Sequence, residues 1–143
     1  MFTYDDFNLM LNRFNEKLMS NNLNTIIYAI GGFAMMCNAK ELGFDSRGIS
    51  IDIDSYYEYS EEIKKLVDEV SDEFGIISES WLNSHWYEQK LKNEGFDETI
   101  ESYPFWKWEQ SSDLTFSNLK VYYANLEGLL RMKLTISYIK QLH

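Results

Sequence analysis

The feature that most restricts what this chain can fold into is the order of the patterns in residues 25–59. An apolar run that predicts a buried strand is followed at once by Gly31 and Gly32, the only adjacent glycines of the chain, and then by a short helical stretch. A second strand is expected at residues 49–54, where isoleucines alternate with polar residues at the period of a half-buried strand. The sequence therefore predicts a strand-helix-strand unit.

Asp52 and Asp54 lie two positions apart in the second expected strand. Their carboxylates should therefore project from one face, about 7 Å apart. At that spacing they repel each other unless a cation lies between them. A divalent ion bound by oxygen atoms, such as Mg²⁺, relieves this repulsion. A solvated pair of acids at a strand edge is the simpler alternative.

The glycine pair suits an anion site, because two residues without Cβ let backbone amides approach a phosphate closely. The helix expected to begin at Phe33 adds the positive end of its dipole. We therefore expect the amides of Gly31, Gly32 and Phe33 to hold the phosphates of a nucleoside triphosphate. A tight turn without a ligand is the alternative.

Residues 31–34, Arg47 and residues 50–54, taken in this order, resemble the nucleotidyltransferase superfamily, above all its minimal branch with the AbiEii-type toxins. The resemblance implies a nucleotidyltransferase-like fold, a small mixed sheet flanked by helices. It also implies an enzyme that binds a nucleoside triphosphate with Mg²⁺ and transfers a nucleotide to a hydroxyl of RNA, protein or a small molecule. Asp52 and Asp54 would bind the metal.

The same resemblance suggests two further nucleotide contacts and a lysine. Ser50 stands where the family often has a threonine, and Arg47 is similar to the arginine that usually precedes the acid pair, although it lies one residue further away. Residues 126–134 are similar to a helix that carries an active-site lysine in AbiEii-type relatives, which gives Lys133 a phosphate contact. Arg47 as a solvated loop charge, and Lys133 with its chain directed to solvent, are the alternatives.

Many enzymes of this family complete a two-metal site with a third carboxylate on a later strand. Glu101, Glu109 and Asp113 are candidates, and Glu109 is preferred because it ends an edge strand expected at residues 103–109. In the relatives the last helix is followed by further Arg and Asp residues. The chain is therefore expected to be a minimal version of the domain or to lack that extension. A catalytically inactive binding module, or a toxin-antitoxin component that docks a partner protein, is the alternative function.

The charge of the chain restricts its partners. With 23 acidic and 13 basic residues, its formal net charge is −10. Since no basic block offsets this charge, neither long nucleic acid nor an anionic membrane is expected as a partner, whereas a basic protein is. The single Cys37 and two distant histidines give little support to a zinc site. An acidic N-terminus and the absence of a membrane-length apolar run favour the cytoplasm.

Periodicity predicts the remaining elements. A helix is expected over residues 3–19 with Thr3 as its N-cap and Asp6 three residues later, and a second helix after Ser60. A strand at residues 119–123 and a last helix capped by Asn125 follow. With 143 residues, the chain is expected to form one domain over residues 1–143, of the α/β (α+β) class. Its four tryptophans either fill the core or stack on a base.

Overall fold

The structure is a computed structural model that describes residues 1–45, 48–57, 60–76, 80–84, 107–131 and 134. Its elements in chain order are α1 (Tyr4–Ser20), β1 (Thr25–Ala29), α2 (Gly31–Glu41), β2 (Ile53–Tyr57), α3 (Glu61–Glu73), β3 (Leu82–Asn83), β4 (Trp108–Thr115) and β5 (Leu119–Ala124). A further helical segment follows Asn125 and includes residues 126–131.

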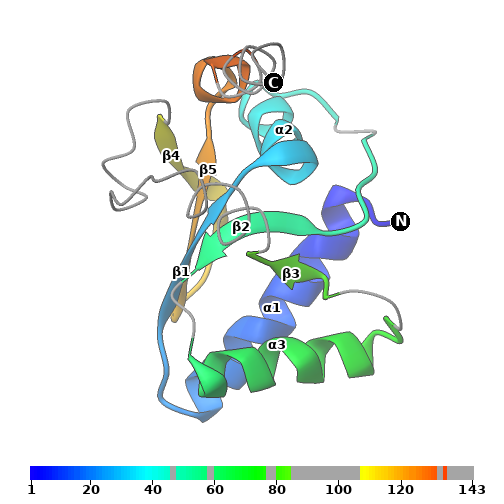
Figure 1. The fold of residues 1–143 in the computed structure, drawn as a ribbon, viewed down its shortest axis with the longest axis vertical. Coiled ribbons are helices and arrows are strands. Elements are labelled where there is room, and N and C mark those ends of the chain that lie inside the picture. The colour runs from blue at the N-terminus through cyan, green and yellow to red at the C-terminus, as the bar shows by residue number, and fades with distance from the viewer. Residues whose placement is uncertain (46–47, 58–59, 77–79, 85–106, 132–133, 135–143) are drawn as a thin grey trace, which may run out of the picture.

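The strands form one five-stranded sheet in the order β3-β2-β1-β5-β4. β1 runs antiparallel to β2 and parallel to β5, β2 runs parallel to β3, and β4 runs antiparallel to β5. The helices α1 and α3 lie beside each other, and α2 lies at the end of the sheet where β1 ends (Figure 1). The predicted α/β (α+β) class with a mixed sheet is thus confirmed.

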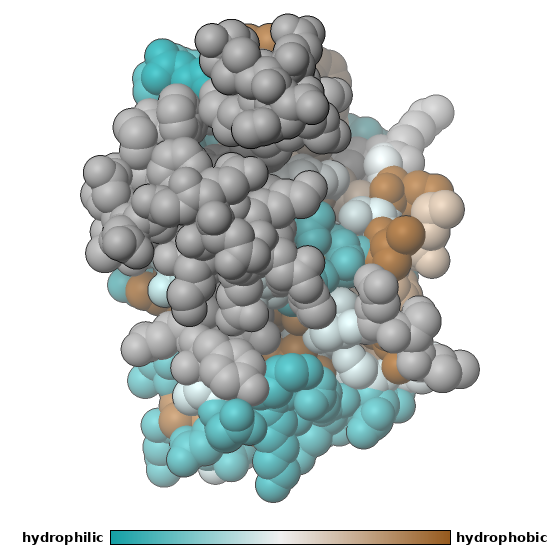
Figure 2. Space-filling model, in the orientation of Figure 1, coloured by the Kyte–Doolittle hydropathy of each residue, from teal (hydrophilic) through white to brown (hydrophobic). Residues whose placement is uncertain are grey.

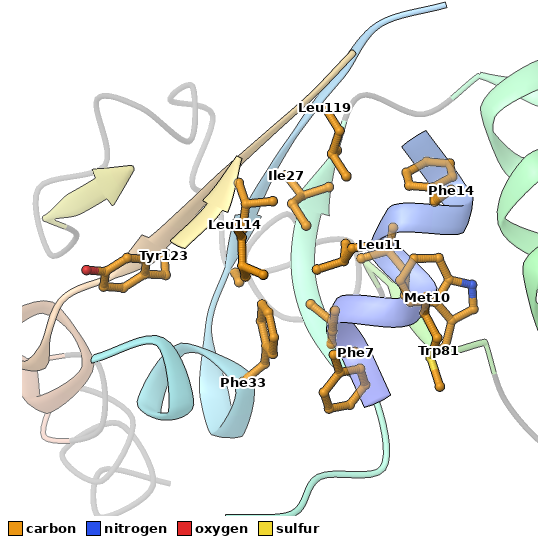
Figure 3. Packing of buried hydrophobic residues seen from close by; sticks show 14 of the residues in the cluster. Phe7, Met10, Leu11, Phe14, Ile27, Phe33, Trp81, Leu114, Leu119 and Tyr123 are labelled. Atoms are coloured by element: carbon orange, nitrogen blue, oxygen red, sulfur yellow. The ribbon is translucent and has the colours of Figure 1, made fainter. Parts of the chain in front are cut away.

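The core lies between α1 and one face of the sheet. The apolar stripe of α1 is fully buried, as its spacing predicts, and consists of Phe7, Met10, Leu11, Phe14 and Leu18. Leu11 lies beside Ile27 of β1, Met10 and Phe14 lie beside Trp81, and Phe33 of α2 packs near Phe7 at one end of the core (Figure 3). Burial of this stripe is the main source of stability for the pairing of helix and sheet.

The start of α1 is fixed by a capping box, as predicted. The Thr3 hydroxyl accepts a hydrogen bond from the Asp6 amide at 3.2 Å, and the Asp6 carboxylate accepts one from the Thr3 amide at 2.8 Å. At the start of α3, the Ser60 hydroxyl accepts a hydrogen bond from the Ile63 amide at 3.1 Å. Both caps satisfy helix amides that have no partner within the helix.

The side of α3 that faces away from the core is polar and mostly acidic. Five of its acidic residues are exposed to solvent, namely Glu61, Glu62, Asp68, Asp72 and Glu73. Figure 2 shows the corresponding hydrophilic surface at the base of the molecule. The opposite side of the helix packs inward through Leu66, Val67 and Val70, and the buried Trp81 indole donates a hydrogen bond to the Val67 carbonyl at 3.0 Å.

Two predicted boundaries are wrong. The second strand begins at Ile53, and not at Ile49, because neighbouring strands accompany the chain only from that point. Ile49 and Ile51 are 56% and 61% exposed, and Ser50 is paired only with Phe2 in an isolated bridge. The helix expected from Phe33 already begins at Gly31, so the glycines are its first residues.

The other strand predictions were close. β1 covers most of the apolar run expected as a strand before the glycines, and β5 extends the strand expected at residues 119–123 by one residue. β4 is at the edge of the sheet, as predicted for this region, but it begins at Trp108 and continues to Thr115. Residues 103–106 of the predicted edge strand lie outside the described part of the chain.

Candidate functional site

The start of α2 lies directly against two polar side chains. A Cβ added to Gly31 would be 3.3 Å from Asp54 Oδ2, and one added to Gly32 would be 3.2 Å from Ser50 Oγ. Gly31 also has a φ of +65°, a conformation that favours glycine. The two glycines therefore allow the first turn of the helix to approach a carboxylate and a hydroxyl at close range.

The topology of the sheet produces this approach. β1 ends where its antiparallel neighbour β2 begins, and the Ile30 amide continues the pairing by donating to the Asp54 carbonyl at 2.8 Å. Ile30 is also the N-cap of α2, and it offers no side-chain hydrogen bond to the helix amides. The positive end of the helix dipole thus lies beside the first residues of β2.

Asp52 lies in a bend just before β2, so its position does not depend on the strand ladder. Its Oδ2 accepts a hydrogen bond from Asn83 Nδ2 at 2.8 Å, and its backbone carbonyl accepts one from Ser50 Oγ at 3.0 Å. Ser50 therefore links Asp52 to the glycines. The structure brings together Gly31, Gly32, Ser50, Asp52 and Asp54, all singled out in the sequence.

Phe33 contributes to this site through its backbone only. Its amide belongs to the first turn of α2, but its ring is fully buried. The ring packs edge-on against Phe7, with 5.3 Å between the centroids, and stacks on Tyr4 at 6.2 Å. The side chain anchors the helix start to the core and keeps the glycine amides in place.

Asn83 is a site residue that sequence reasoning missed. It pairs with Asp54 across the parallel strands β2 and β3, and its side chain reaches Asp52. The only signal in the sequence is a polar residue directly after the apolar pair Trp81 and Leu82. The strand pairing that makes this signal meaningful joins segments about thirty residues apart and follows no local pattern.

Glu109 is not brought to this site. It pairs with Tyr123 of β5, Tyr123 pairs with Ala29 of β1, and Ala29 pairs with Ser55 of β2. Glu109 thus projects from the same face of the sheet as Ser55 and from the opposite face to Asp54. Its strand, β4, lies three strands away from β2, which is about 14 Å at the usual strand spacing. Its carboxylate accepts a hydrogen bond from the Tyr123 hydroxyl at 3.1 Å.

Burial and the bond to Glu109 raise the pKa of Tyr123. Asp113 is engaged in a similar way, as it accepts a hydrogen bond from the Tyr4 hydroxyl at 2.6 Å, and burial together with this bond raises the pKa of Tyr4. Glu109 and Asp113 thus each accept a hydrogen bond from a tyrosine hydroxyl on the side of the sheet that the helices cover. Arg47, Glu101 and Lys133 lie outside the described residues.

The acids near the glycines are fewer than a complete protein cage for a metal ion needs. Within the described ranges, no group of three His, Cys, Asp or Glu side chains is placed to hold a metal ion. Mg²⁺ is usually bound by one or two carboxylates, with waters and substrate phosphates completing its shell. Asp52 and Asp54, beside a helix start that favours anions, offer these ligands.

Comparison of the chain with protein-family models, curated proteins and solved structures found no match. The nucleotidyltransferase resemblance therefore rests on the sequence motifs alone. Among the described helices, none has both the length and the apolar character that a membrane span requires.

Proposed function

We propose that the protein binds a nucleoside triphosphate with Mg²⁺ and transfers a nucleotide from it to a hydroxyl acceptor. The observation that carries this proposal is the close approach of the first turn of α2 to Asp54 and Ser50, made possible by Gly31 and Gly32. Phosphates favour a helix start with open backbone amides, and the adjacent carboxylates supply the metal ligands. The cytoplasm, where nucleotides and Mg²⁺ are available, is the setting proposed for this activity.

In this proposal each group has a distinct role. The amides of Gly31, Gly32 and Phe33 bind phosphate oxygens, while Asp52 and Asp54 hold Mg²⁺. Bound Mg²⁺ would offset the charge of the phosphates and lower the pKa of an attacking hydroxyl. Ser50 keeps the backbone of Asp52 in place through its 3.0 Å hydrogen bond. Arg47 and Lys133 remain proposed contacts to the nucleotide.

The transfer itself is a substitution at phosphorus. The acceptor oxygen forms a bond to the α-phosphorus, the bond from the α-phosphorus to the bridging oxygen breaks, and pyrophosphate leaves. The hydroxyl proton passes to a carboxylate of the site or to water. The chain contributes mainly by positioning the reactants and by placing positive ends of dipoles near developing negative charge.

Binding of Mg-ATP and Mg-CTP to the unmodified chain and to the double variant Asp52→Asn/Asp54→Asn tests the proposal. We expect calorimetry to detect binding to the unmodified chain only. Asp68→Asn is a matched control, because it removes an exposed carboxylate of α3 that pairs only with Lys64 among the ion pairs described. Equal binding by the double variant, or no binding by any of the proteins, would contradict the proposal.

A second candidate is a catalytically inactive module, for instance a toxin-antitoxin component, that docks a basic partner protein. The exposed acidic side of α3 favours it, because complementary charge steers such encounters. The expected result is co-purification with a basic protein that is released by salt and unaffected by nucleotide. Replacement of Glu61 and Glu62 by Gln should weaken this complex, and an unchanged complex would count against α3 as the docking surface.

A further inference from the structure

Asp52 is held in place by a side chain, whereas Asp54 is held by the sheet. Asp54 belongs to β2, where it pairs with Asn83 of β3 and its carbonyl accepts a hydrogen bond from the amide of Ile30, just after β1. Asp52 lies in the bend before β2, outside the ladder. The hydrogen bond from Asn83 Nδ2 to Asp52 Oδ2, at 2.8 Å, therefore helps to orient this carboxylate.

Asn83 is itself rigidly held. β3 pairs with β2 through the bond from the Ile53 amide to the Trp81 carbonyl at 2.7 Å, and Trp81 is fully buried. The hydroxyl of Ser55, also fully buried, donates to the Asn83 carbonyl at 3.1 Å. With 8% of its surface exposed, Asn83 has little freedom to move. A rigid donor of this kind can orient the carboxylate of a residue that lies outside the strand ladder.

We propose that Asn83 is a positioning residue for metal binding: its amide group holds the Asp52 carboxylate in the direction that lets Asp52 and Asp54 share one Mg²⁺. This inference rests on the proposed function and adds to it a residue that the motifs do not contain. A neutral amide suits this role, because it stabilises Asp52 without adding a third negative charge beside the two acids.

Two substitutions distinguish this role from ordinary core packing. Asn83→Ala removes the donor and should weaken Mn²⁺ binding, measured directly by electron paramagnetic resonance without nucleotide, by about tenfold or more, as loss of such outer-shell partners does. Asn83→Asp places a third carboxylate beside Asp52 and Asp54. It should lower the melting temperature in EDTA, because like charges repel, and bind Mn²⁺ more tightly than the unmodified chain does.

Asn38→Asp provides the matched control. Asn38 is also 8% exposed, and its side chain donates to two backbone carbonyls, those of Ala34 and Ala124, at 2.8 and 3.1 Å. This variant should lose stability that Mg²⁺ does not restore, whereas Mg²⁺ should raise the melting temperature of Asn83→Asp by more than that of the unmodified chain.

The outcomes separate the two proposals. If the unmodified chain binds no Mn²⁺ at millimolar concentration, the metal site and this inference are both wrong. If it binds Mn²⁺ and Asn83→Ala binds it equally well, within twofold, the metal site stands and the role of Asn83 is refuted. If Asn83→Asp fails to fold, the measurement on Asn83→Ala decides.

Discussion

Gly31 and Gly75 form a natural pair for testing the close approach at the start of α2. Gly31 has a φ of +65° and Gly75 a φ of +69°, so replacement by alanine strains both backbones to a similar extent. At Gly75 the added Cβ meets nothing within 4 Å, whereas at Gly31 it meets Asp54 Oδ2 at 3.3 Å. The difference between the two variants isolates the contact with Asp54.

The shared part of the effect follows from backbone sterics. A residue with a Cβ in this left-handed conformation costs about 1–2 kcal/mol, and for a chain of this length each kcal/mol lowers the melting temperature by about 3–5 °C. Gly75→Ala should therefore lose about 3–10 °C in a thermal melt followed by circular dichroism. Gly31→Ala should lose at least as much, because the carboxylate of Asp54 must also shift.

The two glycine variants should differ in ligand binding. Displacement of Asp54 and obstruction of the helix amides should weaken Mg-ATP binding to Gly31→Ala by about tenfold or more, which corresponds to about 1.4 kcal/mol. Gly75→Ala should bind Mg-ATP like the unmodified chain. If calorimetry finds equal affinities for the two variants, the contact of Gly31 with Asp54 has no role in binding and the argument for a phosphate site at α2 is refuted.

Three other predictions test the fold. Trp81→Phe should lower the free energy of unfolding in urea by about 2–4 kcal/mol, since it opens a cavity and leaves the α3 carbonyl without its indole donor; a loss below 1 kcal/mol would contradict this. Hydrogen bonds from Arg13 and then Lys17 lower the pKa of Glu73 to about 2, so its stabilising effect is present above the unfolded pKa near 4.3 and is lost as the pH falls toward 2. Glu73→Gln should make the melting temperature depend less on pH between pH 5 and 3 at low salt. Equal slopes for this variant and the unmodified chain would refute the ion pairs. Burial raises the pKa of the Cys37 thiol, so a disulfide reagent at pH 8 should react only after unfolding; rapid reaction with the native chain would place Cys37 outside the core.

The parts of the fold that the sequence predicted are those controlled by neighbours along the chain. The α1 cap depends on Thr3 and Asp6, three residues apart, and its buried stripe recurs every three or four residues. Such patterns are complete within one element, and the structure agrees with them. The helices and their capping positions could therefore be predicted without knowledge of the tertiary structure.

The start of β2 was harder to predict, because a strand exists only where a partner accompanies it. The alternation at Ile49 and Ile51 is as regular as that at Ile53, but of the three only Ile53 pairs with a neighbouring strand, through Leu82 of β3. The first two isoleucines are therefore exposed despite their pattern. The pairing that decides this involves residues far away along the chain, which periodicity does not record.

The same dependence on strand pairing explains why the sequence pattern favoured Glu109 as a third site residue. Carboxylates near the end of a predicted strand are visible in a sequence, but the position of that strand in the sheet is not. Strand order puts β4 three places from β2, whereas β3, only two residues long, is its direct neighbour. The residue that the sheet places beside Asp52 and Asp54 is therefore an amide, Asn83. The effect of Asn83→Asp on metal affinity tests whether this position, set by strand pairing, is the third position of the site.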